Sequence, residues 1–327
     1  MKDDKIVVTK TPLRVSFLGG GTDMPYFYDK YGGATISCAI NRYIYVTAKF
    51  HNNYQEKYRL SYSKTENTND LSKIKNLRIK KVIEKMGITK PLYINTFADI
   101  PANSGLGSSS SFTVGLIKAL CKLQNKKMTK NQLAEMAYEI ESKITKNSLG
   151  KQDHYIAVHG GLKYIRYNKN KISVSSLDLD RKNIKNFFNN VFLIWTGKNR
   201  FASSVLKDQK KNLKENYINL IALNFLTKKF KNEILSKKIK IKNIGKLIKE
   251  SWELKKSFSK LITNNDIEKI FKKIDQKGAY GGKLLGAGNG GFILVVISPS
   301  KKKKLVEYIK KHQYIVVKLE KEGSILI

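Results

Sequence analysis

The chain has 327 residues, of which 41% are hydrophobic and 27% are charged, a globular composition that excludes a disordered chain. Its formal net charge is +37, from 63 lysines and arginines against 26 acids. Only seven of these cations are arginines, the residue on which sequence-reading nucleic-acid binders depend, so we expect a solvated lysine-rich surface rather than a nucleic-acid site.

Cysteine and histidine usage excludes several kinds of site. Two cysteines, Cys38 and Cys121, are too few for a disulfide framework or a four-cysteine zinc site, and the four histidines are too scattered for a histidine-built metal centre. The first ten residues contain acids where a signal peptide needs an apolar stretch, and the longest apolar run, Phe292–Ile297, is too short to span a membrane. We therefore expect a soluble cytoplasmic protein.

Strands and two helices are predicted in the first half of the chain. Segments rich in β-branched and aromatic residues predict strands at Lys5–Thr9, Leu13–Leu18, Ile40–Phe50, Leu92–Phe97 and the start of a strand pair at Gly160–Tyr167. Apolar residues at helical spacing predict helices at Ser108–Leu123 and Lys130–Lys143.

The composition changes at residues 171–190, which are polar and rich in asparagine, before a buried type of strand at Val191–Thr196. Residues 207–260 have a helical pattern with sixteen lysines and five acids, and lysines on every face favour a solvated helix pair over a nucleic-acid groove. The last third alternates helices with strands at Phe292–Ile297 and Tyr314–Leu319. We expect an α+β protein of two domains, residues 1–188 and 189–327.

Twelve of the 22 glycines lie in three clusters, where backbone amides can approach a ligand closely. The second cluster, in Pro101-Ala-Asn-Ser-Gly-Leu-Gly-Ser-Ser-Ser-Ser111, follows a strand and opens a helix, so free amides and the helix dipole predict a phosphate site. The loop lacks the Walker pattern, and its serine hydroxyls could cap the helix or bind Mg²⁺. The expected nucleotide-binding residues here are Pro101, Gly105, Leu106, Gly107, Ser108, Ser109 and Ser110.

The third cluster, Gly286-Ala-Gly-Asn-Gly-Gly291, matches the dinucleotide pattern G-x-G-x-x-G. A true dinucleotide fingerprint opens a helix, whereas this segment precedes a strand, which argues against a dinucleotide oxidoreductase. A tight turn into the strand and a loop that braces a nucleotide-phosphate site fit the spacing equally well. In the second interpretation Gly288 belongs to the nucleotide site.

Three segments together resemble, in order, the three motifs of the GHMP small-molecule kinases. They are Pro12-Leu-Arg-Val-Ser-Phe-Leu-Gly-Gly-Gly-Thr-Asp23, the Pro101–Ser111 loop and Lys283-Leu-Leu-Gly-Ala-Gly-Asn-Gly-Gly291. The resemblance covers nearly the whole chain. It implies an N-terminal domain like ribosomal protein S5, a ferredoxin-like C-terminal domain, and ATP and Mg²⁺ as cofactors.

Within the family, the first motif and Gly150-Lys-Gln-Asp-His-Tyr155 resemble the branch that phosphorylates sugars at C1, most of all kinases of D-glycero-D-manno-heptose 7-phosphate. The implied product is the 1,7-bisphosphate, used for nucleotide-activated heptose in surface polysaccharide. His154 stands where this branch usually has glutamine, and Asn289 interrupts a glycine run.

Two alternatives stay open: a fucokinase-like or other C1 sugar kinase, and an anion- or nucleic-acid-binding protein. The expected partners are ATP and a sugar phosphate, without nucleic acid or membrane. The oligomeric state, a homodimer included, is left open.

The resemblance also implies the catalytic and metal-binding residues. Asp153 matches the catalytic aspartate and would be the general base, with a helix cap on the following residues as the alternative. Arg14 matches the basic residue beside it and would favour the ionised carboxylate. Glu141, together with the hydroxyl of Ser109 or Ser110, would hold Mg²⁺, unless it is a plain surface acid or Glu139 takes that role.

Other residues are expected at the sugar. Those of the first motif are Gly20, Gly21, Thr22 and Asp23, the last two as partners of sugar hydroxyls. A heptose 7-phosphate also needs cations away from the nucleotide loops. Arg200 is the leading candidate because arginine is scarce, although it could be a solvated loop cation, and Lys198 and Lys151 are weaker candidates.

Overall fold

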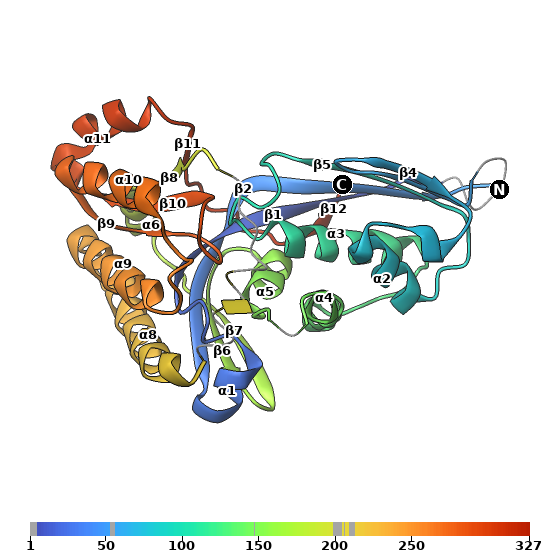
Figure 1. The fold of residues 1–327 in the computed structure, drawn as a ribbon, viewed down its shortest axis with the longest axis horizontal. Coiled ribbons are helices and arrows are strands. Elements are labelled where there is room, and N and C mark those ends of the chain that lie inside the picture. The colour runs from blue at the N-terminus through green and yellow to red at the C-terminus, as the bar shows by residue number, and fades with distance from the viewer. Residues whose placement is uncertain (1–4, 53–55, 147, 199–204, 206, 209–212) are drawn as a thin grey trace.

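The computed structural model describes residues 5–52, 56–146, 148–198, 205, 207–208 and 213–327 (Figure 1). Its elements form two sheets that lie side by side, each with its own helices. The larger sheet has the strand order β12-β1-β2-β5-β3-β4, and β6 and β7 extend it from β2. Its strands are β1 (Val7–Leu18), β2 (Gly33–Phe50), β3 (Tyr58–Ser61), β4 (Thr65–Thr68), β5 (Leu92–Ala98), β6 (Leu162–Asn168), β7 (Lys171–Ser176) and β12 (Ile325–Leu326).

Strand β2 is 18 residues long and joins the parts of this sheet. One edge pairs with β1, while the other edge pairs first with β6 and then with β5. The first eight residues of β2 are all buried, the next three are half-buried, and from Ile44 onward buried and half-buried residues alternate. This alternation is typical of a sheet with one face covered.

Four helices lie on one face of the large sheet, below it in Figure 1. They are α2 (Leu77–Met86), α3 (Ser108–Leu123), α4 (Lys130–Ile144) and α5 (Gln152–His159), and the short α1 (Pro25–Tyr31) lies at the lower end of β2. Their starts are encoded locally: Asn76 accepts hydrogen bonds from two amides of α2, and Thr129 with Gln132 forms a capping box on α4.

The second sheet is antiparallel, with the strand order β11-β8-β10-β9. Its strands are β8 (Val191–Trp195), β9 (Ala279–Leu284), β10 (Phe292–Ile297) and β11 (Tyr314–Val316). Its helices are α6 (Arg181–Phe188), α8 (Leu213–Ile234), α9 (Ile241–Lys256), α10 (Asn265–Gln276) and α11 (Lys302–Ile309). All six residues of β10 are buried, which explains its uninterrupted apolar sequence.

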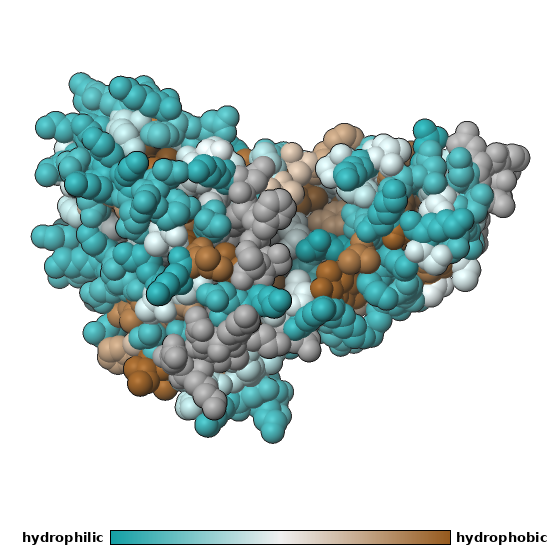
Figure 2. Space-filling model, viewed as in Figure 1, coloured by the Kyte–Doolittle hydropathy of each residue, from teal (hydrophilic) through white to brown (hydrophobic). Residues whose placement is uncertain are grey.

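Hydrophilic side chains cover most of the face shown in Figure 2, over both halves of the molecule. This distribution agrees with a charged surface in contact with solvent. Among the described residues, no helix combines the length and the apolar character that crossing a bilayer requires.

The structure agrees with the predicted positions of α3, α4, β5, β8 and β10, and corrects several others. The two strands expected at Lys5–Thr9 and Leu13–Leu18 are one continuous strand, β1. The polar segment 171–190, where the composition changes, contains β7 and α6. Polar residues are compatible with β7 because its side chains are half-buried or exposed.

The end of the chain returns to the first sheet instead of staying with the second half, where residues 189–327 were expected to form one domain. Strand β12 pairs with β1, and the Ile327 amide donates to the Val8 carbonyl at 3.0 Å. The hydroxyls of Thr11 and Ser324 share a buried hydrogen bond of 2.8 Å. The last residues therefore complete the large sheet.

Replacing Thr11 with valine should destabilise the protein, because the buried Ser324 hydroxyl loses its partner. The free energy of unfolding should fall by about 1–3 kcal/mol, as measured by denaturant unfolding. The double variant Thr11→Val/Ser324→Ala removes both polar groups and should be less destabilised than the two single variants added together. Strict additivity would contradict the contact.

Candidate active site

The phosphate loop, residues 101–111, is attached to the free edge of β1. Beyond Lys10 this edge has no strand partner in the described sheet, and the Arg14 amide donates to the Leu106 carbonyl at 2.9 Å. Gly107 precedes α3 with a φ of +76°, a left-handed conformation that favours glycine. A Cβ atom on Gly107 would lie only 3.0 Å from Cγ of Arg14. The loop therefore packs closely against this edge of β1.

The start of α3 offers open amides. No side chain caps this helix, so the serine hydroxyls do not take the capping role that was the alternative to phosphate binding. Ser108 and Ser109 are half-buried, Ser110 is buried, and Pro101 is exposed at the outer end of the loop. Uncapped amides at the positive end of a helix dipole can bind a phosphate group.

The third glycine loop, residues 286–291, packs against the phosphate loop. The Phe292 amide donates to the Ser104 carbonyl at 3.0 Å. Gly288 lies against the backbone of Ile262, while Asn289 adopts a φ of +61° and its side chain accepts a hydrogen bond from Asn264. Asparagine tolerates this conformation better than most residues, which explains how it replaces a glycine here.

An ion pair lies beneath the phosphate loop. Arg14 Nε and Nη2 donate to the two carboxylate oxygens of Asp153 at 2.7 and 2.6 Å, and Nη1 donates to the Gly105 carbonyl at 2.5 Å. The Asp153 side chain keeps 19% of its surface exposed, whereas that of Arg14 keeps 5%. A Cβ atom on Gly107 would lie 3.3 Å from Asp153 Oδ2. The structure thus brings together the predicted base, its predicted cation and the phosphate loop.

Asp153 lies in the first turn of α5 but does not cap the helix. Its carboxylate binds Arg14 and accepts a third hydrogen bond from Gln152 Nε2 at 3.3 Å. Burial raises the pKa of Asp153, but the charge and hydrogen bonds of Arg14, with smaller effects from His154 and Gln152, lower it more, so the pKa lies below its ordinary value. Asp153 is therefore ionised at neutral pH.

Asp23 caps α5 instead. Its Oδ2 accepts from the Gln152 amide at 3.0 Å and its Oδ1 accepts from the Gly21 amide at 2.9 Å. A Cβ atom on Gly150 would lie 2.0 Å from Oδ2, so only glycine lets the chain pass this close. Burial raises the pKa of Asp23, and the charge of Asp153 raises it further against the opposing effect of these amides.

The Thr22 hydroxyl is committed to the fold. Its single proton is shared between the carbonyls of Gly19 and Ala34, at 2.8 and 2.9 Å, its oxygen accepts from the Ala34 amide at 3.1 Å, and the residue is fully buried. This differs from the expected contact with a sugar hydroxyl. Gly20 and Gly21 are half-buried beside it and keep the loop surface partly open.

Glu141 is also placed differently from the expectation. The residue is fully buried, and its carboxylate accepts hydrogen bonds from Arg78, Ser110, Thr113 and His154. In the described part of the chain, no three His, Cys, Asp or Glu side chains converge as they would around a metal ion. All four contacts of the Glu141 carboxylate come from protein side chains, and its expected role as a Mg²⁺ ligand stays a prediction.

Lys283 is a residue of the site to which the sequence interpretation gave no role. It lies on β9, is 5% exposed, and its Nζ donates to the Phe17 carbonyl of β1 at 3.1 Å. Phe17 is the extra residue of a β-bulge, so its carbonyl has no partner in β2. Burial, with a smaller contribution from the nearby charge of Arg14, lowers the pKa of Lys283 to about 7. Its position at the start of a glycine-rich motif is the feature of the sequence that could have identified Lys283 as a site residue.

The candidates for holding the substrate's own phosphate are spread widely. Lys151 Nζ is paired with Glu135 at 2.6 Å and lies 4.8 Å from the Tyr138 ring centre. Lys198 is exposed and paired with Asp266 at 2.8 Å. Arg200 lies outside the described residues.

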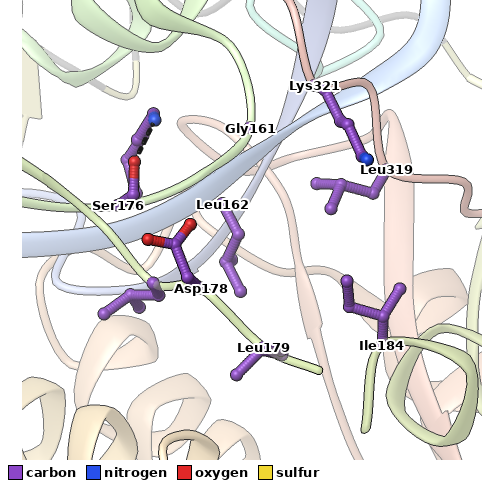
Figure 3. Close-up of a pocket in the computed structure, with 10 residues that line it drawn as sticks. Gly161, Leu162, Ser176, Asp178, Leu179, Ile184, Leu319 and Lys321 are labelled. Carbon is purple, nitrogen blue, oxygen red and sulfur yellow. Dashed lines mark hydrogen bonds between the residues drawn. The ribbon is translucent and has the colours of Figure 1, made fainter. Parts of the chain in front are cut away.

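A cavity of about 290 Å³ lies away from the ion pair, between β6, β7, α6 and the C-terminal segment (Figure 3). Leu162, Ile184 and Leu319 give it an apolar lining, with Asp178 and Lys321 at its side. Asp153 lies in the first turn of α5, whereas Gly161 and Leu162 of the cavity lining follow the end of this helix, so the cavity and the ion pair lie at opposite ends of α5. The cavity is separate from the phosphate loop.

Comparison with known proteins identifies the fold and the family. The GHMP kinases N terminal domain matches residues 74–161, and the GHMP kinases C terminal domain matches residues 233–315. The chain is 30% identical to a D-glycero-alpha-D-manno-heptose 7-phosphate kinase of Campylobacter jejuni, over 94% of each chain. It is 26% identical to the bifunctional fucokinase/GDP-fucose pyrophosphorylase of Arabidopsis thaliana, over 70% of this chain and 22% of that protein.

Solved structures share the fold. A D-glycero-D-manno-heptose 1-phosphate kinase from Bacteroides thetaiotaomicron superposes with a TM-score of 0.80, at 24% identity over 98% of both chains. Galactokinase from Lactococcus lactis superposes with a TM-score of 0.76, at 16% identity over 98% of this chain and 95% of that one. The predicted two-part α+β fold is confirmed. The chain belongs to the GHMP kinases and is a sugar kinase that transfers a phosphoryl group to a hydroxyl acceptor.

Proposed function

We propose that this kinase phosphorylates the C1 hydroxyl of D-glycero-D-manno-heptose 7-phosphate with ATP, forming the 1,7-bisphosphate. Members of the family use ATP as the phosphoryl donor. One juxtaposition carries the proposed chemistry: the Asp153 carboxylate, paired with Arg14, lies against Gly107 where the phosphate loop enters α3. The Campylobacter relative, at 30% identity over nearly the full length, supports the sugar.

Asp153 is the proposed general base. It accepts the proton of the sugar hydroxyl while the hydroxyl oxygen attacks the γ-phosphorus and ADP leaves. A carboxylate with a lowered pKa is a weak base, but an anomeric hydroxyl is more acidic than an ordinary alcohol. Moreover, a largely dissociative transfer needs little removal of the proton before attack.

Cations around the reacting oxygens would stabilise the charge that moves onto them. Arg14 is held by Asp153 and the Gly105 carbonyl, so its guanidinium is already oriented before substrates bind. Lys283 adds a second cation from the other sheet, and the Phe17 carbonyl is the one partner that the described structure gives its ammonium group. The amides at the start of α3 would bind the nucleotide phosphates.

The sugar would lie beside the first motif, where Asp23 joins the Gly21 loop to α5. Asp23 keeps carboxylate capacity for a sugar hydroxyl, since each of its oxygens has one described donor and can accept another. We do not retain Thr22 as a sugar ligand. Arg200 stays a prediction from sequence for the substrate's own phosphate.

The role of Asp153 predicts that Asp153→Asn keeps the shape of the site but loses the base. Turnover should fall far below one tenth of the wild-type rate, with nucleotide binding mostly retained. Asp275→Asn, which removes an exposed carboxylate paired with Lys249, is the matched control and should be nearly neutral. If Asp153→Asn raised the activation barrier by only about 1.4 kcal/mol or less, which is at most a tenfold loss in rate, Asp153 would not be the base.

The pKa directions predict the pH profile. The pKa of Asp153 lies below its ordinary value, so its carboxylate stays ionised throughout the neutral and mildly acidic range. A plot of kcat/KM for ATP against pH should therefore show no fall on the acid side near neutrality. Lys283 loses its charge as the pH rises through about 7, so kcat/KM should fall on the alkaline side. Lys283→Arg stays charged and should remove this fall, whereas Lys283→Met should be slow at every pH. An unchanged alkaline fall in the arginine variant would assign it to another group.

A panel of sugars tests the substrate. With ATP, the enzyme should use the heptose 7-phosphate far better than the unphosphorylated heptose, fucose, galactose or heptose 1-phosphate, as measured by kcat/KM. A desolvated bidentate contact from arginine to a phosphate contributes about 2–4 kcal/mol, so Arg200→Ala should weaken use of the 7-phosphate without changing ATP affinity. Equal use of the free heptose would refute the substrate assignment.

A further inference from the structure

Four helices meet at the carboxylate of Glu141. Oε1 accepts from Arg78 Nε of α2 at 2.5 Å and from Thr113 Oγ1 of α3 at 3.1 Å. Oε2 accepts from Ser110 Oγ of α3 at 2.8 Å and lies 2.9 Å from His154 Nε2 of α5. Glu141 itself is on α4 and is completely buried.

These contacts use the full capacity of the group. Two carboxylate oxygens offer about four acceptor positions, and four donors already occupy them. Burial alone would raise the pKa of Glu141, but His154 and Arg78 lower it well below its ordinary range. A divalent cation would therefore have to displace these donors and lie close to the Arg78 guanidinium, which repels it.

We propose that Glu141 is a positioning residue of the ATP site and not a ligand of Mg²⁺. Its contact with Ser110 holds the first turn of α3, where the phosphate-binding amides are. Its contact with His154 holds the residue next to Asp153 on α5. One buried carboxylate thus sets the distance between the phosphate loop and the base. This inference goes beyond the proposed function, because it applies whichever sugar the enzyme takes.

Two features of the chain support this role. His154 is also fully buried, and its ring packs edge-on against Tyr138, so the side chain that contacts Glu141 is held in place. The Ser108 and Ser109 hydroxyls make no hydrogen bond in the described part of the chain, so protein oxygen for a metal ion at this helix start is available without Glu141.

The decisive experiment measures metal and nucleotide binding separately on the intact protein. The probe is Mn²⁺, followed by the paramagnetic resonance of the free ion, with saturating adenylyl imidodiphosphate. Affinity for the nucleotide analogue itself is measured by calorimetry. Glu141→Gln should leave Mn²⁺ affinity within about twofold of wild type and weaken the analogue at least about threefold. Mn²⁺ binding weakened about tenfold or more would overturn the proposal, and so would unchanged binding of both probes.

A second variant covers the case in which Glu141→Gln does not fold. Arg78 has a side chain that is 34% exposed, so Arg78→Met removes one donor from Glu141 at a more tolerant position. It should weaken the analogue and leave Mn²⁺ affinity unchanged, whereas a change in Mn²⁺ affinity of about tenfold in either direction would overturn the proposal. Arg181→Met, at an exposed arginine of α6, is the matched control and should change neither.

Rescue by a conservative variant separates positioning from simple packing. His154→Gln keeps a hydrogen-bond donor for Glu141, so KM for ATP and kcat should stay near the wild-type values. His154→Leu keeps an apolar side chain without the donor and should raise KM for ATP with a smaller effect on KM for the sugar. Wild-type KM for ATP in the leucine variant would contradict the proposal.

Discussion

The ion pair between Arg14 and Asp153 is the contact on which the site depends. It links β1, the phosphate loop and α5, because Arg14 also binds the Gly105 carbonyl. Arg14 is buried, and a buried guanidinium without a counterion would be strongly destabilising. Here the bidentate geometry and the carbonyl contact compensate for its desolvation. The partly exposed carboxylate is thereby held ionised and fixed in direction.

The second sheet contributes to this arrangement through β1. The bulge at Phe17 frees a backbone carbonyl for Lys283, while the Phe17 ring packs against Phe187 and Phe230 at centroid distances of 5.2 and 5.9 Å. A shift of β9 relative to β1 would therefore leave a buried ammonium without its described partner. Lys283 consequently ties the position of the second sheet to the same strand that carries Arg14.

Much of this organisation could be predicted from the sequence, because it follows from local signals. Helical periodicity located α3 and α4, and a glycine-rich, serine-rich segment between a strand and a helix located the phosphate loop. The pairing of Arg14 with Asp153, 139 residues apart, required the family resemblance, since neither residue is distinctive by itself. The position of each residue within its own strand or helix does not show that Arg14 and Asp153 are in contact.

The misplaced predictions share a physical cause: contacts between residues that are distant in the chain. Thr22 and Glu141 are polar residues of motif-like segments, which suggests ligand contacts. In the fold, the Thr22 hydroxyl and the Glu141 carboxylate bind backbone or side chains of other elements. The return of β12 to β1 was likewise invisible, because a two-residue strand has no periodicity. Burial of these groups could be known only from the packed structure.

The charge of the site differs in kind from the charge of the surface. Most of the +37 arises from lysines, and such a surface speeds the approach of anions without selecting among them. The cations at the site are Arg14 and Lys283, both at least 95% buried. Arg14 is already matched by Asp153, whereas Lys283 faces only a carbonyl dipole among its described partners. Burial therefore disfavours the charged form of Lys283 beside the Arg14–Asp153 pair, and its pKa is lowered to about 7. An ATP phosphate bound at the adjoining loop would supply a counter-charge for the ammonium group of Lys283. Binding would then relieve the electrostatic cost that this buried lysine has in the free enzyme, which favours the nucleotide complex.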